Sequence, residues 1–311
     1  MDATALGLAA VFALVACSAP GSQSGQSNTA QQAGATDWKS VEQALGKAGS
    51  MQPGDVYKIS LPRSDLQVTV NGVQIKPALA LGSWVAFKQM GDRAMVMGDL
   101  VLTEDEVTSV MTKLQAGGVE QTALHNHVLH ETPRVLYMHI NAVGNAVKIA
   151  KALHDALSLS KTPFPTQAAP PAVSEQDLGL DTKQLDQIMG QTGKVNGGVY
   201  QFSVPRAETV SDNGMEVPPA MGVATAINFQ PTGGSKAAIT GDFVLSASEV
   251  NPVIRALRDN GIEVTALHSH MLTESPRLFF MHFWANDDAQ KLARGLRAAL
   301  DRVNVAKGQP K

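Results

Sequence analysis

An internal duplication constrains the fold of this 311-residue chain more than any other feature of its sequence. Shifted by 143 residues, the chain aligns with itself from Tyr57 on Tyr200 to His139 on His282. The longest match pairs ALHNHVLHETPRVLYMH with ALHSHMLTESPRLFFMH, and 10 of these 17 positions are identical. A chain of this length can also hold two domains with separate cores. We therefore expect one domain type present twice.

The two repeats are expected at residues 37–160 and 175–305. Between them, residues 161–174 include the segment TPFPTQAAPP, whose composition offers neither helical nor strand periodicity and indicates a linker. Before the first repeat, residues 18–36 are rich in Ser, Gly, Gln and Ala, which is the composition of a flexible tether.

Each repeat is expected to open with a short helix, over 37–47 with Thr36 as its cap in the first copy, and after Asp181 in the second. Asn71-Gly72 lies between apolar flanks and predicts a hairpin turn. Alternating or β-branched residues predict four strands around this turn, at 56–61, 66–70, 78–88 and 94–101.

The second half of each repeat predicts the order β-α-β-β-α. In the first copy, Thr103 with Glu106 three residues later is a capping-box signature at the start of a helix. Strands over 119–128 and 134–141 and a helix over 143–157 complete the unit. This order is of the ferredoxin-like split kind, and the predicted fold class is α+β.

Three histidines of the first repeat lie in the predicted hairpin. His125 and His127 are two residues apart in a strand, so their imidazoles should project from the same face. A turn centred near Thr132 places His125 opposite His139, and Glu131 in the turn is the nearest carboxylate. The second repeat supplies the same four residue types at identical spacing: His268, His270, Glu274 and His282.

Three imidazoles and a carboxylate suit a divalent transition metal such as Zn, Mn, Fe, Ni or Cu, because neutral imidazole is a borderline ligand. The sequence therefore predicts one metal site in each repeat. The ligands are His125, His127, Glu131 and His139 in the first, and His268, His270, Glu274 and His282 in the second. Two alternatives are hydrogen-bonded histidines that only build the sheet, and metal-free acid–base chemistry.

Other residues beside the hairpin have more than one interpretation. Arg134 and Arg277 could bind an anionic substrate or form ion pairs with nearby carboxylates. Asp99 and Asp242 could add a carboxylate to the site or cap the following helix. Met138 is expected to fill the core, because adjacent residues of a strand face opposite sides of the sheet.

The N-terminus has the features of an export signal, although its first four residues contain no Lys or Arg. The apolar run over 5–16 has the length of a signal-peptide core and is too short to span a bilayer as a mature helix. It ends in LVAC, which resembles the bacterial lipobox, so residues 1–17 are expected to be a lipoprotein signal peptide with Cys17 as the lipid anchor. Cys17 is the only cysteine, so no disulfide is expected.

The doubled A-L-H-x-H…P-R…M-H signature, the lipobox and the total length together resemble the LppY/LpqO-type bacterial lipoproteins. This resemblance covers nearly all of the mature chain and implies a duplicated domain in an exported protein, anchored by its lipid at the periplasmic face or the cell surface. The family lends no activity or catalytic residue to carry over.

Charge excludes one class of partner. The 25 Lys and Arg residues are balanced by 28 Asp and Glu, and no long basic run could follow a phosphate backbone, so nucleic acid is not expected. The residues themselves favour a cell-envelope protein that binds a divalent transition metal. The alternatives are a metal-dependent hydrolase or oxygenase, and a structural or interaction lipoprotein that needs no metal.

Overall fold

The computed structural model describes residues 36–164 and 178–306, which belong to one compact unit. Each repeat contains a six-stranded antiparallel sheet. The order of the first sheet, β1-β2-β5-β6-β9-β7, recurs in the second as β10-β11-β14-β15-β18-β16. The fold is α+β with two homologous repeats, as the duplication predicts. The predicted signal peptide, the tether and most of the linker lie outside the described residues.

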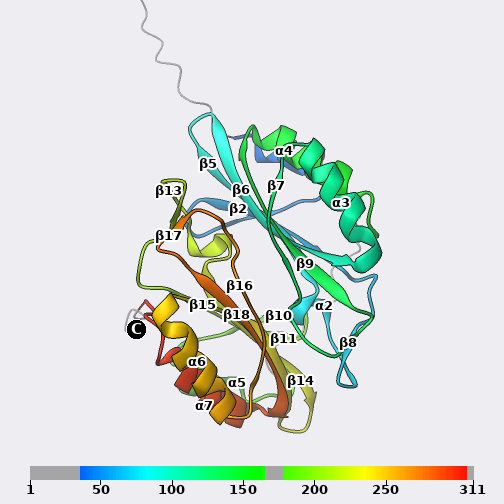
Figure 1. Ribbon diagram of the computed structural model, residues 1–311. Coiled ribbons are helices and arrows are strands. Elements are labelled where there is room, and N and C mark those ends of the chain that lie inside the picture. Colours follow the sequence, from blue (N-terminus) through cyan, green and yellow to red (C-terminus); the bar gives the residue numbers. More distant parts are fainter. Residues whose placement is uncertain (1–35, 165–177, 307–311) are drawn as a thin grey trace, which may run out of the picture. The chain divides into compact units, whose positions relative to one another are not determined.

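The first repeat has helices on one face of its sheet and a small arm beside it (Figure 1). The sheet consists of β1 (Ser50–Gln52), β2 (Val56–Pro62), β5 (Gly82–Met90), β6 (Arg93–Thr103), β7 (Glu120–His125) and β9 (Val135–Gly144). The helices are α1 (Trp38–Leu45), α3 (Glu104–Ala116) and α4 (Ala146–Leu157). The arm holds β3 (Thr69–Val70), β4 (Val73–Gln74), β8 (Glu131–Thr132) and α2 (Pro77–Ala80).

The second repeat follows the same plan. Its sheet consists of β10 (Lys194–Asn196), β11 (Val199–Pro205), β14 (Ala224–Gly233), β15 (Lys236–Leu245), β16 (Glu263–His268) and β18 (Phe279–Asp288). The helices are α5 (Thr182–Met189), α6 (Ala247–Asp259) and α7 (Ala289–Leu300). The arm holds β12 (Ser211–Asp212), β13 (Met215–Glu216), β17 (Glu274–Ser275) and the short helix η2 (Pro219–Met221). None of the described helices is both long and apolar enough to cross a membrane.

Local sequence signals account for most element ends. The capping box of α3 forms as predicted, with Glu106 Oε2 accepting from Thr103 N at 3.0 Å. Asn71-Gly72 forms the predicted hairpin turn between β3 and β4, and both residues have positive φ. The cap of α1 is Asp37 and not Thr36, because the Asp37 carboxylate accepts from Lys39 N.

The end of one strand and the start of the helix after it both lie later in the sequence than predicted. β9 continues to Gly144, so α4 starts at Ala146, three residues later than predicted. The elements β6, α3, β7, β9 and α4 occur in the predicted order, but β8 lies between β7 and β9 in the sequence and pairs with β3. The closer likeness to a ferredoxin-like unit stays a prediction.

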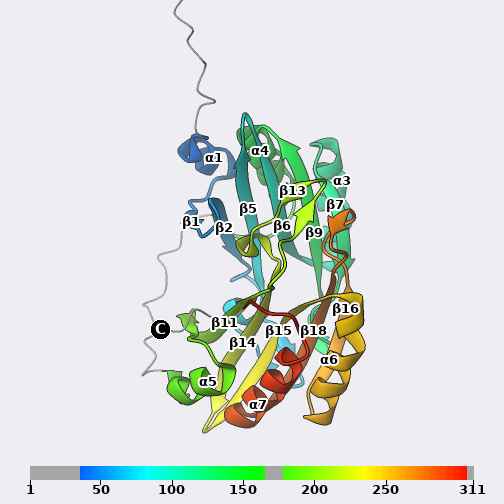
Figure 2. The ribbon, with the colours of Figure 1, turned by 90° about the vertical axis from the view of Figure 1, so that its left-hand side faces the viewer.

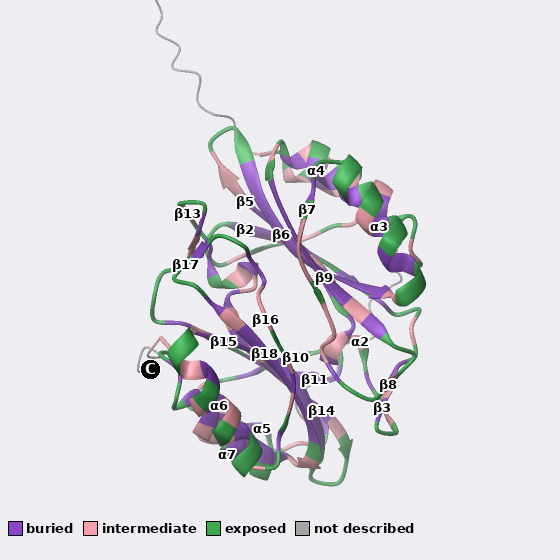
Figure 3. Cartoon of the chain, viewed as in Figure 1, coloured by how far each residue is buried: buried purple, intermediate pink, exposed green. Residues whose placement is uncertain are grey.

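The strand residues alternate between two different environments. In β9, Met138 and Ile140 pack into the core under the helices, and the prediction that Met138 fills the core is confirmed. Tyr137 and His139 are also buried but point to the other face of the sheet. Both faces of the central strands are therefore covered, and Figure 3 shows the buried colour along most of β6 and β9.

The second face of each sheet packs against the other repeat. One apolar cluster combines Met95 and Met97 of the first repeat with residues of the second arm, including Val217 and Met221. A second cluster combines residues of the first arm with Trp284 of β18. Because each arm packs on the opposite sheet, the two repeats are related by an approximate twofold exchange (Figure 2).

Two hydrogen bonds between the repeats obey the same exchange. Thr122 Oγ1 donates to His270 O at 2.6 Å, and Thr265 Oγ1 donates to His127 O at 2.5 Å. Since 122 and 265 differ by the repeat offset, as do 127 and 270, these are two copies of one contact. They fix the backbone next to the histidines of both hairpins.

Candidate metal centre

Six of the eight histidines gather where the two repeats meet. β7 ends at His125, His127 follows it in a loop, and His139 lies on the neighbouring strand β9. The corresponding residues of the second repeat are His268 at the end of β16, His270 beyond it, and His282 on β18.

The predicted pairing of the histidine strands is wrong by two residues. Ala123 lies opposite His139, and His125 lies opposite Tyr137. The register shifts between Gln121 and Ala123, which the sequence did not reveal. Because the error is an even number of residues, His125 and His139 still project from one face of the sheet.

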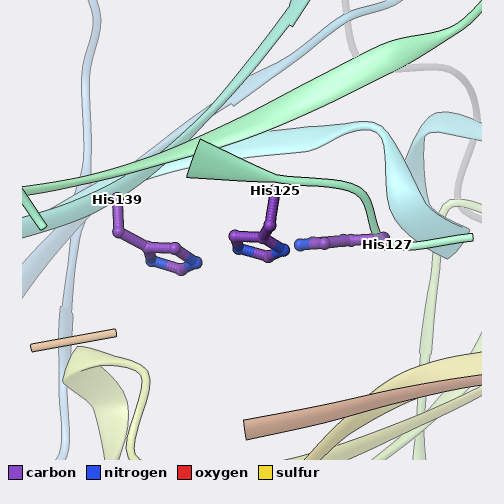
Figure 4. A group of neighbouring side chains, drawn as sticks. All are labelled: His125, His127 and His139. Atoms are coloured by element: carbon purple, nitrogen blue, oxygen red, sulfur yellow. The ribbon is translucent and has the colours of Figure 1, made fainter. Parts of the chain in front are cut away.

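The three rings of the first repeat converge as expected (Figure 4). The ring of His125 lies between the other two, with centroids 5.2 Å from His127 and 5.0 Å from His139. Nitrogen atoms of these three residues all lie within 4.8 Å of one another. The short loop after β7 turns His127 back toward the strand, where its ring stacks on Tyr137.

The sequence predicted two separate sites, and the structure corrects this to one combined cluster. Across the interface the ring centroids of His125 and His268 are 3.5 Å apart. Those of His127 and His282 are 3.9 Å apart, and those of His139 and His270 are 3.8 Å apart. These contacts between repeats are shorter than those between histidines of one repeat.

Asp99 and Asp242 supply the carboxylates of this cluster. Asp99 lies in β6 opposite His139, and Asp242 lies in β15 opposite His282. Asp99 approaches His127 Nε2 at 3.6 Å and His139 Nε2 at 3.9 Å. Asp242 lies 3.1 Å from His270 Nε2 and 4.0 Å from His282 Nδ1. Of the two interpretations open for these aspartates, the one that places them beside the histidines is correct.

Glu131 and Glu274, predicted as ligands, do not join the histidine groups. Glu131 belongs to β8 in the arm, and its Oε1 accepts from Val135 N at 3.2 Å. Glu274 Oε1 accepts from Leu278 N at 3.0 Å, and its Oε2 pairs with Arg277 at 3.2 Å. The chain leaves the main sheet after β7 and pairs with the arm, so the hairpin expected to fold the glutamates over the rings does not form.

The arginines after the prolines form ion pairs. Arg277 pairs with Glu274 and also donates to Ser269 Oγ at 3.0 Å. Arg134 is exposed and lies 3.7 Å from Glu104, not from Glu131. Neither arginine therefore takes part in the histidine cluster, and anion binding by them stays a prediction.

The cluster contains buried nitrogen atoms without hydrogen-bond partners. Within the described ranges, the Nε2 atoms of all six histidines are buried and none forms a hydrogen bond of ordinary geometry. His125 Nδ1 faces Asn126 O at 2.9 Å, and His282 Nδ1 faces Gly241 O at 2.7 Å. A carbonyl only accepts, so both Nδ1 atoms carry the proton and both Nε2 atoms present a lone pair.

The electrostatics keep the three imidazoles of the first repeat neutral. Burial, followed by repulsion from His282, lowers the pKa of His125 to about 3. Burial also lowers the pKa of His127 and of His139 far below the usual value for histidine. Neutral imidazole is the form that ligates metals.

The two carboxylates are affected in opposite directions. Burial and the nearby charge of Asp242 raise the pKa of Asp99 well above its usual range. Burial also raises the pKa of Asp242, but His282 and His270 outweigh it, so the net shift is downward. Two acidic groups that lie close together among histidine rings form a site that favours a cation.

A second repeated set of charges was not recognised as a unit from the sequence. Arg63, which follows Pro62 in the first repeat, is fully buried and pairs with Asp65 and Glu106 at 2.8 and 2.7 Å. Arg206 pairs with Glu208 and Glu249 in the same way at 3.0 and 2.7 Å. The signal was present, because the arginine and the helix-capping glutamate both recur at the repeat offset.

Comparisons with known proteins identify the repeated domain. No curated protein matches the chain. A trimeric bacterial microcompartment shell protein, PduB, matches at 13% identity over 83% of this chain and 91% of that one, with a TM-score of 0.21. EtuB from Clostridium kluyveri matches at 8% identity over 82% and 90%, with a TM-score of 0.20. Such low scores support no inference. Residues 39–159 and 183–302 each match the Domain of Unknown Function DUF1259, and the chain belongs to that family as a duplicated member.

Proposed function

We propose that this protein binds divalent transition metal ions through the six histidines and two aspartates at the interface between its repeats. One observation carries the proposal: six histidines gather at the interface, and in the described part of the chain their buried Nε2 atoms form no hydrogen bond of ordinary geometry, with His270 Nε2 lying 3.1 Å from Asp242 Oδ2. Buried polar atoms in folded proteins are nearly always paired, and each unpaired one costs about 1–3 kcal/mol. Ligation of an ion gives these lone pairs their partner.

The donor set supports the choice of metal class. Neutral imidazole nitrogen together with carboxylate oxygen suits Zn, Mn, Fe, Ni and Cu(II). The single cysteine, Cys17, lies outside both repeats, so no thiolate competes. Backbone carbonyls at Asn126 and Gly241 orient two of the rings, as second-layer partners do in known metal sites.

The purely structural alternative agrees less well with these contacts. Histidines that serve only to build a sheet are expected to hydrogen-bond through both nitrogens to backbone or side chains. His154 lies far from the cluster and differs from the clustered histidines: its Nδ1 contacts Leu45 O at 2.9 Å, and its Nε2 is not among the buried atoms that lack a partner in the described residues. The clustered histidines instead bury their Nε2 atoms among other histidine rings and the two aspartates, without hydrogen bonds of ordinary geometry in the described residues.

Metal content measured by plasma mass spectrometry tests the proposal. The protein is purified without chelator or histidine tag, then incubated with Zn, Mn, Cu and Ni in turn and desalted. We expect bound metal in the wild type and its loss in the His125→Ala/His268→Ala variant. His130→Ala is the matched control, because His130 is exposed and outside the cluster. Near-zero metal in all three proteins under every condition would refute the proposal.

We further propose that the protein acts at the cell envelope as a lipoprotein of the LppY/LpqO type, anchored through Cys17. The lipobox-like LVAC sequence and the polar segment after it support this assignment. Labelling with a radioactive fatty acid in cells tests it: the wild type should incorporate label and sediment with membranes. A Cys17→Ala variant should do neither, and equal labelling of both proteins would contradict lipid attachment at this residue.

A further inference from the structure

We infer that the centre holds two metal ions side by side, each bound by a triad of histidines drawn from both repeats, with Asp99 and Asp242 bridging the two ions. This inference rests on the proposed function and adds the number of ions, their ligands and the role of the carboxylates. It begins from the approximate twofold relation of the repeats. Any site displaced from the twofold axis has a counterpart on the other side.

One of the two triads, called the second triad, consists of His139, His268 and His270. Nitrogen atoms of its three members all lie within 4.8 Å of one another. Its ring centroids are 3.8, 5.0 and 5.8 Å apart. The shortest of these distances joins His139 of the first repeat to His270 of the second.

The twofold exchange converts these residues into the first triad, defined as His282, His125 and His127. Its ring centroids are 3.9, 5.2 and 5.3 Å apart, which closely matches the second triad. The two triads adjoin through His125 and His268, whose ring centroids are 3.5 Å apart, whereas His125 and His270 are separated by 6.5 Å. Each triad takes two histidines from one repeat and one from the other.

The aspartates decide how the triads are related. Asp99 directs Oδ2 toward His127 of the first triad at 3.6 Å and Oδ1 toward His139 of the second at 3.9 Å. Asp242 directs Oδ2 toward His270 of the second triad at 3.1 Å and Oδ1 toward His282 of the first at 4.0 Å. Each carboxylate therefore has one oxygen nearer each triad, which is the arrangement of a bridging carboxylate. Three of these four contacts are to Nε2, and the fourth, from Asp242 Oδ1, is to the proton-bearing Nδ1 of His282.

Two ions can be ligated by all six histidines and both aspartates, whereas a single ion cannot contact them all. A single ion takes about four to six ligands, and the eight side chains here divide into two equal sets around two positions. Asp99 Oδ1 and Asp242 Oδ1 are both buried and lack hydrogen bonds within the described ranges. Protein sites with two metals place them about 3.5–4 Å apart, a separation that a carboxylate spans with its two oxygens.

The test counts ions in the purified full chain loaded with Mn²⁺ and compares two double variants. We expect about two ions per chain in the wild type. His127→Ala/His282→Ala removes ligands from one triad only, so it should retain about one ion. His127→Ala/His139→Ala removes one ligand from each triad and should retain almost none. Circular dichroism of the metal-free proteins establishes that the variants are folded.

If each ion were instead bound by the three histidines of a single repeat, His127 and His139 would serve the same ion. The His127→Ala/His139→Ala variant would then retain more metal than His127→Ala/His282→Ala. That result, or an equal loss of bound metal in the two variants, would overturn the assignment of the triads. One ion in the wild type would overturn the paired centre but leave the proposed function intact, whereas no ion would refute both.

Electron paramagnetic resonance of the Mn²⁺-loaded protein tests the carboxylate bridge. Two bridged ions should give an exchange-coupled spectrum, which Asp99→Asn and Asp242→Asn should each weaken. Isolated six-line signals from two bound ions would refute the bridge.

Discussion

Replacing Arg63 by methionine should destabilise the fold more than any surface change. Arg63 is fully buried, and its guanidinium makes hydrogen bonds to three groups: Asp65, Glu106 and the Val101 carbonyl. Methionine fills similar space but leaves Glu106, itself buried, without its cation. Breaking a buried ion pair in this way costs about 3–5 kcal/mol. The Glu106 carboxylate keeps its bonds from Thr103 N and Lys161 N, which places the expected loss near the lower end.

Urea unfolding followed by tryptophan fluorescence measures this loss. Arg63→Lys keeps the charge but not the planar fork, so it should lose less than Arg63→Met. Arg63→Met/Glu106→Gln should lose less than the sum of its single changes, by about 0.5–3 kcal/mol. Arg206→Met repeats the test in the second repeat, where the contacts are the same. A loss below about 1 kcal/mol for Arg63→Met would refute the reasoning.

The pH dependence gives a further check on the same pair. Burial raises the pKa of Glu106, but hydrogen bonds from Arg63 and two backbone amides outweigh it and hold the pKa below the usual glutamate value of about 4.3. The stabilisation is therefore present above that pH and is lost as the pH falls through the lower folded-state value. Without Arg63, burial dominates and protonation becomes favourable. The stability difference between wild type and Arg63→Met should narrow below about pH 4.

Three other predictions use the same unfolding measurement. Gly241→Ala should lower the free energy of unfolding by about 3 kcal/mol or more, because the added Cβ would lie 1.9 Å from Ala226 O. Gly144→Ala is the matched control. It should change the free energy by at most about 0.5 kcal/mol, because the nearest atom to its Cβ is 3.6 Å away. Comparable losses would contradict the steric argument. Thr122→Val and Thr265→Val should each cost about 1 kcal/mol by removing a hydrogen bond between the repeats; an unchanged midpoint for both would show that these bonds do not hold the interface. Metal at about 1,000 times its dissociation constant should add about 4 kcal/mol and raise Tm by roughly 8–16 °C, an increase that EDTA should reverse and that should be absent in His125→Ala/His268→Ala. An unchanged Tm at saturating metal would count against binding at this interface.

The sequence predicted the elements of this fold well where the signal is local. Thr103 with Glu106, and Asn71 with Gly72, each specify their structure within four residues, and both predictions are confirmed. The alternation at residues 137–140 separated the histidine face from the core face and placed Met138 correctly. These signals depend on the pleat and on capping chemistry, which need no knowledge of distant contacts.

The site required long-range information that no local pattern contains. β7 pairs with β9 so that His125 lies opposite Tyr137, two positions from its predicted partner His139. The pairing of β8 with β3 carried Glu131 away from the rings, over a separation of about sixty residues that spacing within the hairpin could not anticipate. Asp99 was weighed as a carboxylate donor but could not be chosen over Glu131, because its place depends on which strand pairs with β9.

The same reasoning explains why two identical motifs produce one centre. A duplicated domain that packs on its copy through an approximate twofold interface brings each residue near the axis close to its own counterpart. His125 and His268 are such a pair, with ring centroids 3.5 Å apart. Residues further from the axis meet a different partner, so His127 contacts His282, and His139 contacts His270. A metal-binding motif placed at such an interface must therefore exchange ligands between copies. Neither repeat alone contains the cluster, because the shortest ring contact of His125, His139 and His282 is in each case with a histidine of the other repeat.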